Sequence, residues 1–359
     1  MNDETSIAPP PNKTINETIS FYELYNKHKS SLSAGFRDLF LHFSLYFSLC
    51  ILLIHFRHNY LISLTLIMFL SGIIGRTILI FHHCGHNSYT PSKFINYVLS
   101  NITGAIIFLP HCWHYRHLTH HMTLGNIDNE FEFNQNELIF HTFNQYKNFS
   151  RYKKGIYKIL LHPLPFFTLI TWIKLFIVER IYAVKFFIKR YYVQPPYTTI
   201  IFDQIINNML IGVLLLTMYK NNILYHYLLS TALAQSYISF IFFNEHTYNP
   251  SYVEKNNEWN IQTASIHSSS IIVLPSYLYY FLDGEAYHHI HHSNAKIPFY
   301  NLKKYHEEVI SKSDIYDDVV KLTLVDCYNN MWLKLYDEDK KKYITFAEAD
   351  EEIRKDKDI

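Results

Sequence analysis

The chain has 359 residues and a formal net charge of +1; apolar residues make up 49% of it and aromatic residues 17%, while glycine and proline are sparse. This composition fits a helical protein with a large core, or one embedded in a membrane, better than a β-rich or disordered protein. The balanced charge, with no basic stripe interleaved with Tyr and Phe, excludes a nucleic-acid-binding footprint. Four scattered cysteines without a Cys-x-x-Cys pair argue against a disulfide framework, whereas 22 histidines require an explanation.

The N-terminal part of the sequence predicts a polar arm followed by a membrane hairpin. Residues 1–38 are polar and lack the basic and apolar regions of a cleaved signal peptide. Residues 39–56 and 61–81 are nearly uncharged apolar runs, each close to the roughly 20 residues that a helix needs to cross a bilayer. Because the connection between them is so short, we expect a tight antiparallel hairpin, with the Arg76 side chain extending toward the interface.

Residues 199–218 and 223–243 predict a second hairpin of the same kind. Polar residues near its start favour contacts between helices, with a wall of the substrate channel as the alternative. These residues are Asp203, Gln204, Asn207 and Asn208.

Residues 97–110 and 268–282 are apolar but short or broken by proline, so they predict interfacial or re-entrant segments. Residues 155–195 mix apolar residues with periodic Lys and Arg, which is typical of helices on a membrane surface.

The distribution of Lys and Arg predicts the orientation of these helices. The outer turns carry one basic residue each, Arg57 and Lys220, and nearly all the others lie on the opposite side, which the positive-inside rule assigns to the cytosol. We therefore expect an all-α integral membrane protein with four transmembrane helices in two hairpins and a cytosolic helical cap that holds a two-metal site. This transmembrane domain covers residues 39–310, and residues 311–359 form a charged, solvated cytosolic tail, so both termini are cytosolic.

Three clusters of histidines fall in segments that this topology places on the cytosolic side. Within each cluster, spacings of three and four residues put the rings on one face of a helix. The clusters are His82 and His86; His117, His120 and His121; and His288, His291 and His292. His246, just past the last predicted span, is a further candidate on the same side.

Eight imidazoles on three helical faces suit two metal ions better than one, because a structural zinc takes four ligands and a catalytic zinc three plus water. Imidazole binds iron, copper, nickel or zinc, so the ligand type leaves the metal open. One alternative is a histidine tract that sequesters metal, and another is a membrane protein that binds or transports metal without catalysis. Helical spacing and apolar flanks favour a built site.

The remaining histidines have weaker claims. His83, His114 and His289 fall off the shared faces and are either neighbours of the ligands or groups that orient them; His111 and His306 are weaker still. Isolated histidines are expected at surfaces or helix contacts, and these are His28, His42, His55, His58, His141, His162, His226 and His267.

With these clusters in this order, the chain resembles the membrane fatty acid desaturases, which carry three histidine boxes between and after two transmembrane hairpins. The similarity runs from about residue 40 to residue 310. It is most specific in residues 284–306, which are similar to the acyl-lipid delta-12 (omega-6) group, and residues 246–275 also resemble that group. Matching residues in the latter stretch are His246, Thr247, Tyr252 and Trp259, and the resemblance implies that His246 is an extra metal ligand. Departures from many relatives occur at His83, Tyr248, Glu285, Ala286 and Ser293; they bear on the substrate rather than on the metal site.

The resemblance implies a di-iron enzyme that uses O2 and two electrons to introduce a cis double bond into a lipid-linked acyl chain. A fatty acid hydroxylase of the same superfamily is the closest alternative. The outward ring nitrogens of the ligands need hydrogen-bond acceptors, for which Asp128 and Glu285 are candidates. The shape of a hydrophobic tunnel between the spans, rather than the histidine boxes, is expected to decide the position of the double bond.

The electron donor and the location follow from other parts of the sequence. No His-Pro-Gly-Gly haem signature occurs, so a separate donor, a cytochrome b5-type protein or a ferredoxin, is expected. The basic helices of residues 151–190 are a candidate docking face for it, with contact to lipid headgroups as the other interpretation. The final residues, with Lys355 and Lys357, are similar to a dilysine retrieval signal and predict the endoplasmic reticulum membrane.

Overall fold

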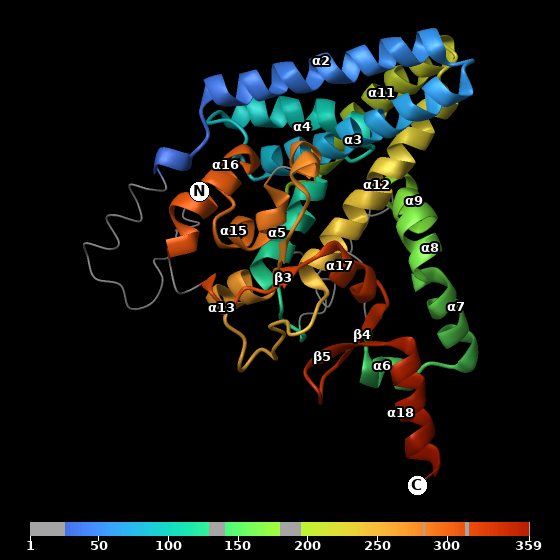
Figure 1. Cartoon of the computed structure of the whole chain (residues 1–359), viewed down its shortest axis with the longest axis vertical. Helices are drawn as coiled ribbons and strands as arrows, with labels where there is room; N and C mark the ends of the chain where they lie inside the picture. The colour runs from blue at the N-terminus through green and yellow to red at the C-terminus, as the bar shows by residue number, and fades with distance from the viewer. Residues whose placement is uncertain (1–25, 129–140, 180–194, 283, 313–315, 359) are drawn as a thin grey trace.

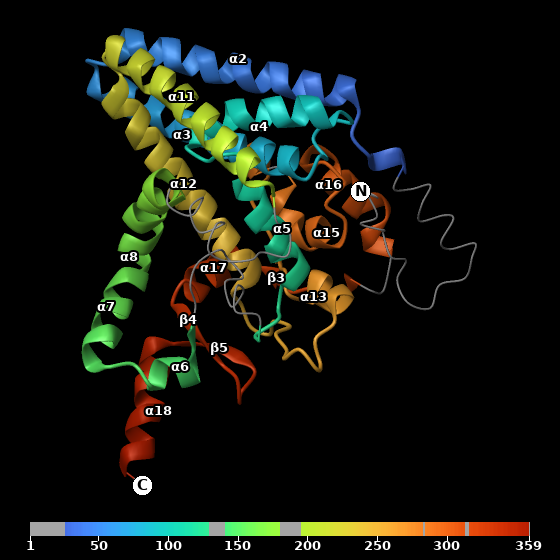
Figure 2. The ribbon, with the colours of Figure 1, turned by 180° about the vertical axis from the view of Figure 1, so that it is seen from behind.

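The computed structural model describes residues 26–128, 141–179, 195–282, 284–312 and 316–358, and these are mostly helical, as the sequence predicts (Figures 1 and 2). The longer helices are α2 (Leu32–Phe56), α3 (Tyr60–Gly85), α4 (Lys93–Ile107), α5 (Trp113–Thr123), α7 (Arg151–Leu161), α11 (Tyr197–Lys220), α12 (Leu224–His246), α13 (Ile261–His267), α15 (His288–Ser293), α16 (Phe299–Glu308), α17 (Leu324–Asn330) and α18 (Phe346–Asp358). The short helical elements are α6 (Phe143–Lys147), α8 (Pro163–Pro165), η1 (Phe166–Ile170), α9 (Thr171–Ile173), η2 (Lys174–Val178), η3 (Ser276–Leu278), α14 (Tyr279–Leu282), η4 (Glu285–Tyr287) and η5 (Ile310–Lys312). The strands are β1 (His141–Thr142), β2 (Ile271–Ile272), β3 (Lys321–Leu322), β4 (Leu333–Asp337) and β5 (Lys342–Thr345).

Two antiparallel helix pairs, α2 with α3 and α11 with α12, form the predicted hairpins. A side chain fixes the start of α3 after the first turn: Asn59 accepts a hydrogen bond from the backbone N–H of Ile62 at 3.1 Å and so caps the N-terminus of this helix. Both connecting turns lie at the same end of the molecule, in the upper right of Figure 1, whereas α5 and α15 lie toward the other end. The helices that carry the histidine clusters are therefore grouped at one end of the hairpins.

The helix pairs differ in how apolar they are. In length and composition, α2, α3 and α11 are each able to cross a membrane. Helix α12 covers the fourth predicted span but is not among them, because polar residues such as Ser230, Thr231 and Gln235 interrupt its apolar sequence. These three side chains are buried, and α12 packs closely against α3, so its polar groups face protein instead of lipid.

Helix α4 packs against α3 and α11. The backbone carbonyl groups at and just after its C-terminal end accept hydrogen bonds from side chains of other helices. After Ile107 the chain turns at Phe108, which has a left-handed φ of 63°, and heads back toward α5. Three side chains donate hydrogen bonds to the backbone carbonyls at this turn: Tyr227 to Ile106 (3.1 Å), Gln235 to Ile107 (3.0 Å) and Asn207 to Leu109 (2.9 Å). Such internal partners are what a helix end needs when it lies among membrane spans. That residues 97–110 form an interfacial or re-entrant segment stays a prediction.

The polar residues near the start of α11 also make contacts between helices. Asp203 accepts a hydrogen bond from the Tyr97 hydroxyl at 2.8 Å, and the Gln204 amide lies 3.7 Å from the Cys112 thiol. Together with the hydrogen bond of Asn207, these contacts support the interpretation that the polar residues join helices. Asn208 is exposed.

Residues 151–178 do not simply lie on a surface. They form two helical halves, Arg151–Leu161 and Pro163–Val178, bent by 55°, which together are apolar enough for a broken span or a re-entrant loop. The second half packs along α12, where the Trp172 indole donates a hydrogen bond to the Thr231 hydroxyl at 3.4 Å. The prediction of surface helices over residues 155–195 is therefore wrong for this half, because its aromatic residues find partners on α12; residues 180–194 lie outside the described part of the chain.

Arg76 does not extend to an interface. Its side chain is buried, forms an ion pair with Asp38 of α2, and donates a hydrogen bond to the backbone carbonyl of Tyr280 at 2.8 Å. The Tyr89 hydroxyl donates a further hydrogen bond to Asp38 at 2.9 Å. The charged Arg76 is tolerated within the apolar helix α3 because Asp38 of a second helix pairs with it. The apolar sequence around Arg76 does not reveal this partner.

The C-terminal region is folded rather than solvated. Strands β1, β4 and β5 form a small sheet in that order, with β1 parallel and β5 antiparallel to β4. Helices α6 and α18 pack on it around a small core of Phe143, Tyr146, Leu335, Ile344, Ala349 and Ile353. The prediction of a solvated tail at residues 311–359 is wrong for this part, because apolar residues spaced among its charges pack against helix α6.

The last residues of the predicted N-terminal arm, residues 1–38, belong to helix α2. Helix α2 begins at Leu32, where Ser31 accepts a hydrogen bond from the backbone N–H of Ala34 at 3.2 Å. Residues 1–25 of the arm lie outside the described part of the chain.

Candidate metal centre

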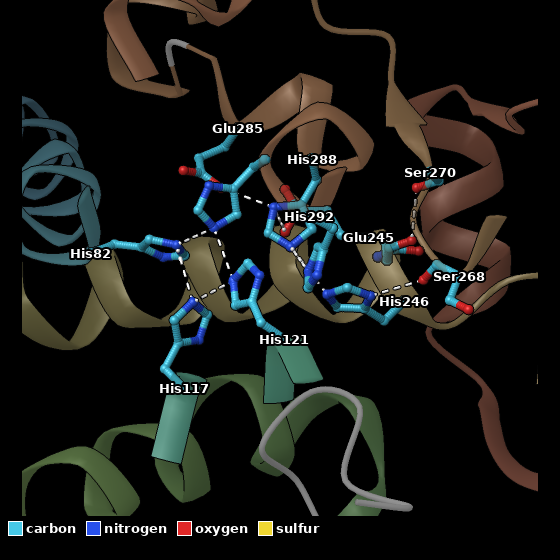
Figure 3. A network of polar contacts seen from close by, with 12 residues as sticks. His82, His117, His121, Glu245, His246, Ser268, Ser270, Glu285, His288 and His292 are labelled. Atoms are coloured by element: carbon cyan, nitrogen blue, oxygen red, sulfur yellow. Dashed lines mark hydrogen bonds and ion pairs between the residues drawn. The ribbon is translucent and has the colours of Figure 1, made fainter. Parts of the chain in front are cut away.

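Four helices bring all nine predicted histidines to one place at the inner ends of the hairpins. The end of α3 carries His82 and His86, α5 carries His117, His120 and His121, α12 ends at His246, and α15 carries His288, His291 and His292. Figure 3 shows the rings of six of them converging between these helices, namely His82, His117, His121, His246, His288 and His292. The structure therefore joins residues that are more than 200 positions apart in the chain into one cluster.

The first group consists of five histidines, whose candidate ligand atoms all lie within 4.8 Å of one another: His82, His86, His117, His121 and His291. The Nε2 atom of His82 lies 2.7 Å from Nε2 of His291 and 3.2 Å from Nε2 of His117. Nε2 of His121 lies 3.0 Å from that of His117 and 3.1 Å from that of His291.

The second group is formed by His120, His246 and His292, whose candidate ligand atoms also lie within 4.8 Å of one another. His288 completes it, because its Nε2 lies 3.0 Å from Nε2 of both His246 and His292. The two groups are neighbours: the ring of His121 stacks on that of His292 at 4.2 Å between centroids. The nine rings thus divide into five and four.

These separations test whether the groups fit metal ions. Metal–imidazole bonds are about 2.0–2.1 Å long, so two nitrogens bound to one ion at right angles lie about 3.0 Å apart. Seven of the nine rings are represented in the Nε2 pairs given above, at 2.7 to 3.2 Å. The nitrogens therefore converge as a shared ion requires, and not as rings that merely pack in a core.

Burial keeps these imidazoles in the form that binds metal. Desolvation lowers the pKa of His117, His120 and His291 well below the usual value for histidine, and neighbouring imidazoles lower it further. A lowered pKa favours the neutral form of these three rings, and a neutral imidazole has a lone pair to offer to an ion.

Hydrogen bonds on the outer nitrogens fix the orientation of two rings in the second group. Nδ1 of His246 donates to the backbone carbonyl of Ser268 at 2.9 Å, and Nδ1 of His288 donates to the Glu285 carboxylate at 3.1 Å. Both bonds place the ring proton on Nδ1 and leave Nε2 free for an ion. Glu285 is thus placed as the sequence predicted for an orienting carboxylate.

Of the other residues predicted to orient the ligands, one lies beside the site and two do not. His83 is buried, with Nε2 3.4 Å from Glu285 and Nδ1 3.0 Å from the Ser88 hydroxyl, so it lies beside the site. Asp128 does not: it is exposed and accepts a hydrogen bond from the backbone N–H of Asn256 at 2.9 Å. His289 is also in the wrong place, because its ring contacts His306 and Tyr316 on the other side of α15.

Sequence reasoning missed two contributors. Glu245 is fully buried, with a carboxylate oxygen 3.5 Å from Nδ1 of His288. The signal was present, since a glutamate directly before His246 closes an otherwise uncharged helix. The Ser268 carbonyl had no signal, because a backbone acceptor carries no side-chain identity.

Comparison with known proteins agrees with this geometry. The chain is 27% identical over 292 residues to a "Fatty acid desaturase" of Bacillus subtilis (strain 168), covering 80% of this chain and 78% of the relative. Shorter matches of 50 residues, 14% of either chain, link it at 40% identity to an "sn-1 acyl-lipid omega-3 desaturase (ferredoxin)" of Nostoc sp. (strain 36). A match of the same length, at 38% identity, links it to an "Omega-3 fatty acid desaturase, endoplasmic reticulum" of Nicotiana tabacum. Residues 57–320 match the family described as "Fatty acid desaturase", and because they make up most of the chain, the protein belongs to the fatty acid desaturase family.

Proposed function

We propose that the nine histidines hold two iron ions and that the protein desaturates a lipid-linked acyl chain. The observation that carries this proposal is the convergence of nine imidazoles into two adjacent groups at one end of membrane-spanning helices. His82, His86, His117, His121 and His291 would bind one ion, and His120, His246, His288 and His292 the other. Bound iron would supply the oxidising power that no side chain has.

The reaction removes two hydrogens from neighbouring methylenes. In balanced form, –CH2–CH2– with O2, two electrons and two protons gives –CH=CH– and two waters. The protein's part is to orient the imidazoles, to exclude bulk water by burying them, and to hold the acyl chain beside them. The orienting bonds of His246 and His288 serve the first of these tasks.

An apolar groove is our candidate for the binding site of the acyl chain. It has a volume of about 510 Å³ and lies between α3 and α12 on one side and the segments around Pro163 and Trp332 on the other. Its lining includes Met68, Leu233 and Phe240, which belong to the helices that end in the histidine cluster. An apolar site of this kind suits an alkyl chain.

For the position of the double bond we propose delta-12 (omega-6), on the similarity of residues 284–306 to that group. The test is expression in a yeast host, followed by gas chromatography of the lipids with location of the double bond, beside a His291→Ala variant. We expect new dienes from the native protein and none from the variant. An omega-3 product would reassign the position, a hydroxylated product without dienes would favour the hydroxylase, and metal binding without any product would favour a metal-binding or transport protein.

We further propose a separate electron donor, a cytochrome b5-type protein or a ferredoxin, and a location in the endoplasmic reticulum with both termini cytosolic. The basic helix α7 remains a candidate docking face, although Lys158 is already paired with Asp350 of α18. Reconstitution of the purified protein with each donor, with oxidation of the donor as the readout, distinguishes the two. Fluorescent tagging of each terminus with selective permeabilisation tests the orientation.

A further inference from the structure

Glu245 is the one buried carboxylate at the metal centre that the proposed function leaves unexplained. It is 0% exposed, and among the residues that the structure describes none donates a hydrogen bond to either of its carboxylate oxygens. Burying a carboxylate without a partner is costly, and such groups are retained where a cation or another charge-stabilising partner compensates them. A compensating interaction is therefore needed to explain why a carboxylate is buried at position 245.

The backbone around Glu245 is firmly held. The Ser270 N–H donates to the Glu245 carbonyl at 2.9 Å, and the Ser270 hydroxyl donates to the Asn244 carbonyl at 3.1 Å (Figure 3). The next residue is His246, which is itself fixed by Ser268. The side chain of Glu245 is consequently aimed by an anchored helix end and not by chance packing.

The outer nitrogen of His288 is a close polar neighbour of the Glu245 carboxylate. Oε2 of Glu245 lies 3.5 Å from Nδ1 of His288, and Oε2 of Glu285 lies 3.1 Å from the same atom. Two buried carboxylates therefore share one imidazole of the four-histidine group, whose Nε2 faces His246 and His292. Among the described residues, Nδ1 of His82 and of His291 in the five-histidine group has no hydrogen-bond partner, and the same holds for Nδ1 of His120 and of His292 in the four-histidine group. The feature particular to the four-histidine group is therefore the pair of carboxylates at His288.

We propose that Glu245 is a positioning residue that, together with Glu285, makes the four-histidine group electrostatically distinct from the five-histidine group. This inference rests on the proposed function. Two divalent ions bring four positive charges to the imidazoles, and the two buried carboxylates, which both approach His288, offset part of that charge most closely at the four-histidine group. Glu245 thereby orients His288 and strengthens binding of the ion at the four-histidine group.

The experiment compares four purified proteins in detergent: the native chain, Glu245→Gln, Glu245→Asp and Asp203→Asn. Asp203 is the matched control, because it is also a fully buried carboxylate in a membrane helix but binds Tyr97, away from the histidines. The readouts are iron per chain, and the number of distinct iron environments seen by Mössbauer spectroscopy.

Loss of a group that orients a metal ligand lowers metal affinity on the order of 10–100-fold. We therefore expect Glu245→Gln to lose about half of its iron, with one of two iron environments lost or altered, and Glu245→Asp to recover part of it. Asp203→Asn should match the native protein. Native iron content and spectrum in Glu245→Gln would overturn the inference, and if that variant does not fold, a native result for Glu245→Asp would do so. Iron absent from the native chain would instead refute the proposed function.

Discussion

A Cβ atom added to Gly85 would lie 1.8 Å from Nδ1 of His114, so the end of α3 touches α5 at a point where no other residue fits. This contact sets the distance between the first two histidine clusters. Substitution Gly85→Ala must displace the His114 ring, or α5 together with it, although it alters no ligand. We expect at least a tenfold loss of desaturation, because small misplacements of reacting groups are costly, together with reduced iron content.

Gly212→Ala is the control for this substitution, because nothing lies within 4 Å of a Cβ at that position of α11. It should leave both product and iron unchanged. Native activity in Gly85→Ala would show that α5 has more freedom than this contact allows.

The buried ion pair between Arg76 and Asp38 predicts an asymmetric response to mutation. Asp38→Ala leaves the buried guanidinium without its carboxylate, which typically costs about 3–5 kcal/mol. The double variant Asp38→Leu, Arg76→Met removes both charges and should be more stable than Asp38→Ala. Thermal unfolding in detergent measures this order, and a double variant less stable than the single one would contradict it.

Lys334 predicts a pH dependence of stability. Its ammonium group is buried against the rings of Phe166, Phe167 and Phe243, at 4.1 to 5.2 Å from their centroids, and burial lowers the pKa of Lys334 from 10.5 to about 7. Between these values the folded protein binds fewer protons than the unfolded chain, so stability rises with pH, by up to about 1.4 kcal/mol per unit.

We therefore expect the melting temperature of the native protein, relative to that of Lys334→Met, to rise between pH 7 and pH 9. The variant lacks the titrating group and serves as the reference at each pH. A constant difference between the two proteins would mean that the aromatic rings keep the ammonium charged throughout.

Filling the groove between α3 and α12 tests its proposed role. Ser236 lines the groove, so Ser236→Trp should reduce product by at least tenfold at unchanged iron content, because the acyl chain would lose its position. Leu216→Trp, on the exposed face of α11 and outside the groove lining, is the matched control and should have native activity. Equal activity in both variants would place the acyl chain elsewhere.

The sequence by itself determined the local features of this protein. Apolar runs of bilayer length predicted the hairpins, and histidines three and four residues apart predicted which rings share a helical face, because both signals depend only on helix geometry. It also identified all nine histidines that converge. It misjudged Arg76, Asp128 and His289, because the residues that each of them contacts come from other segments of the fold.

Only the tertiary structure decided how those histidines divide. His291 joins the five-histidine group, while His288 and His292 from the same helix face join the other, and Glu245 lies against His288. The crossing of α3, α5, α12 and α15 makes this division, and it depends on contacts between residues up to about 200 positions apart, such as His82 with His291. Spacing along one helix fixes which way side chains point, but only packing between helices fixes what they meet.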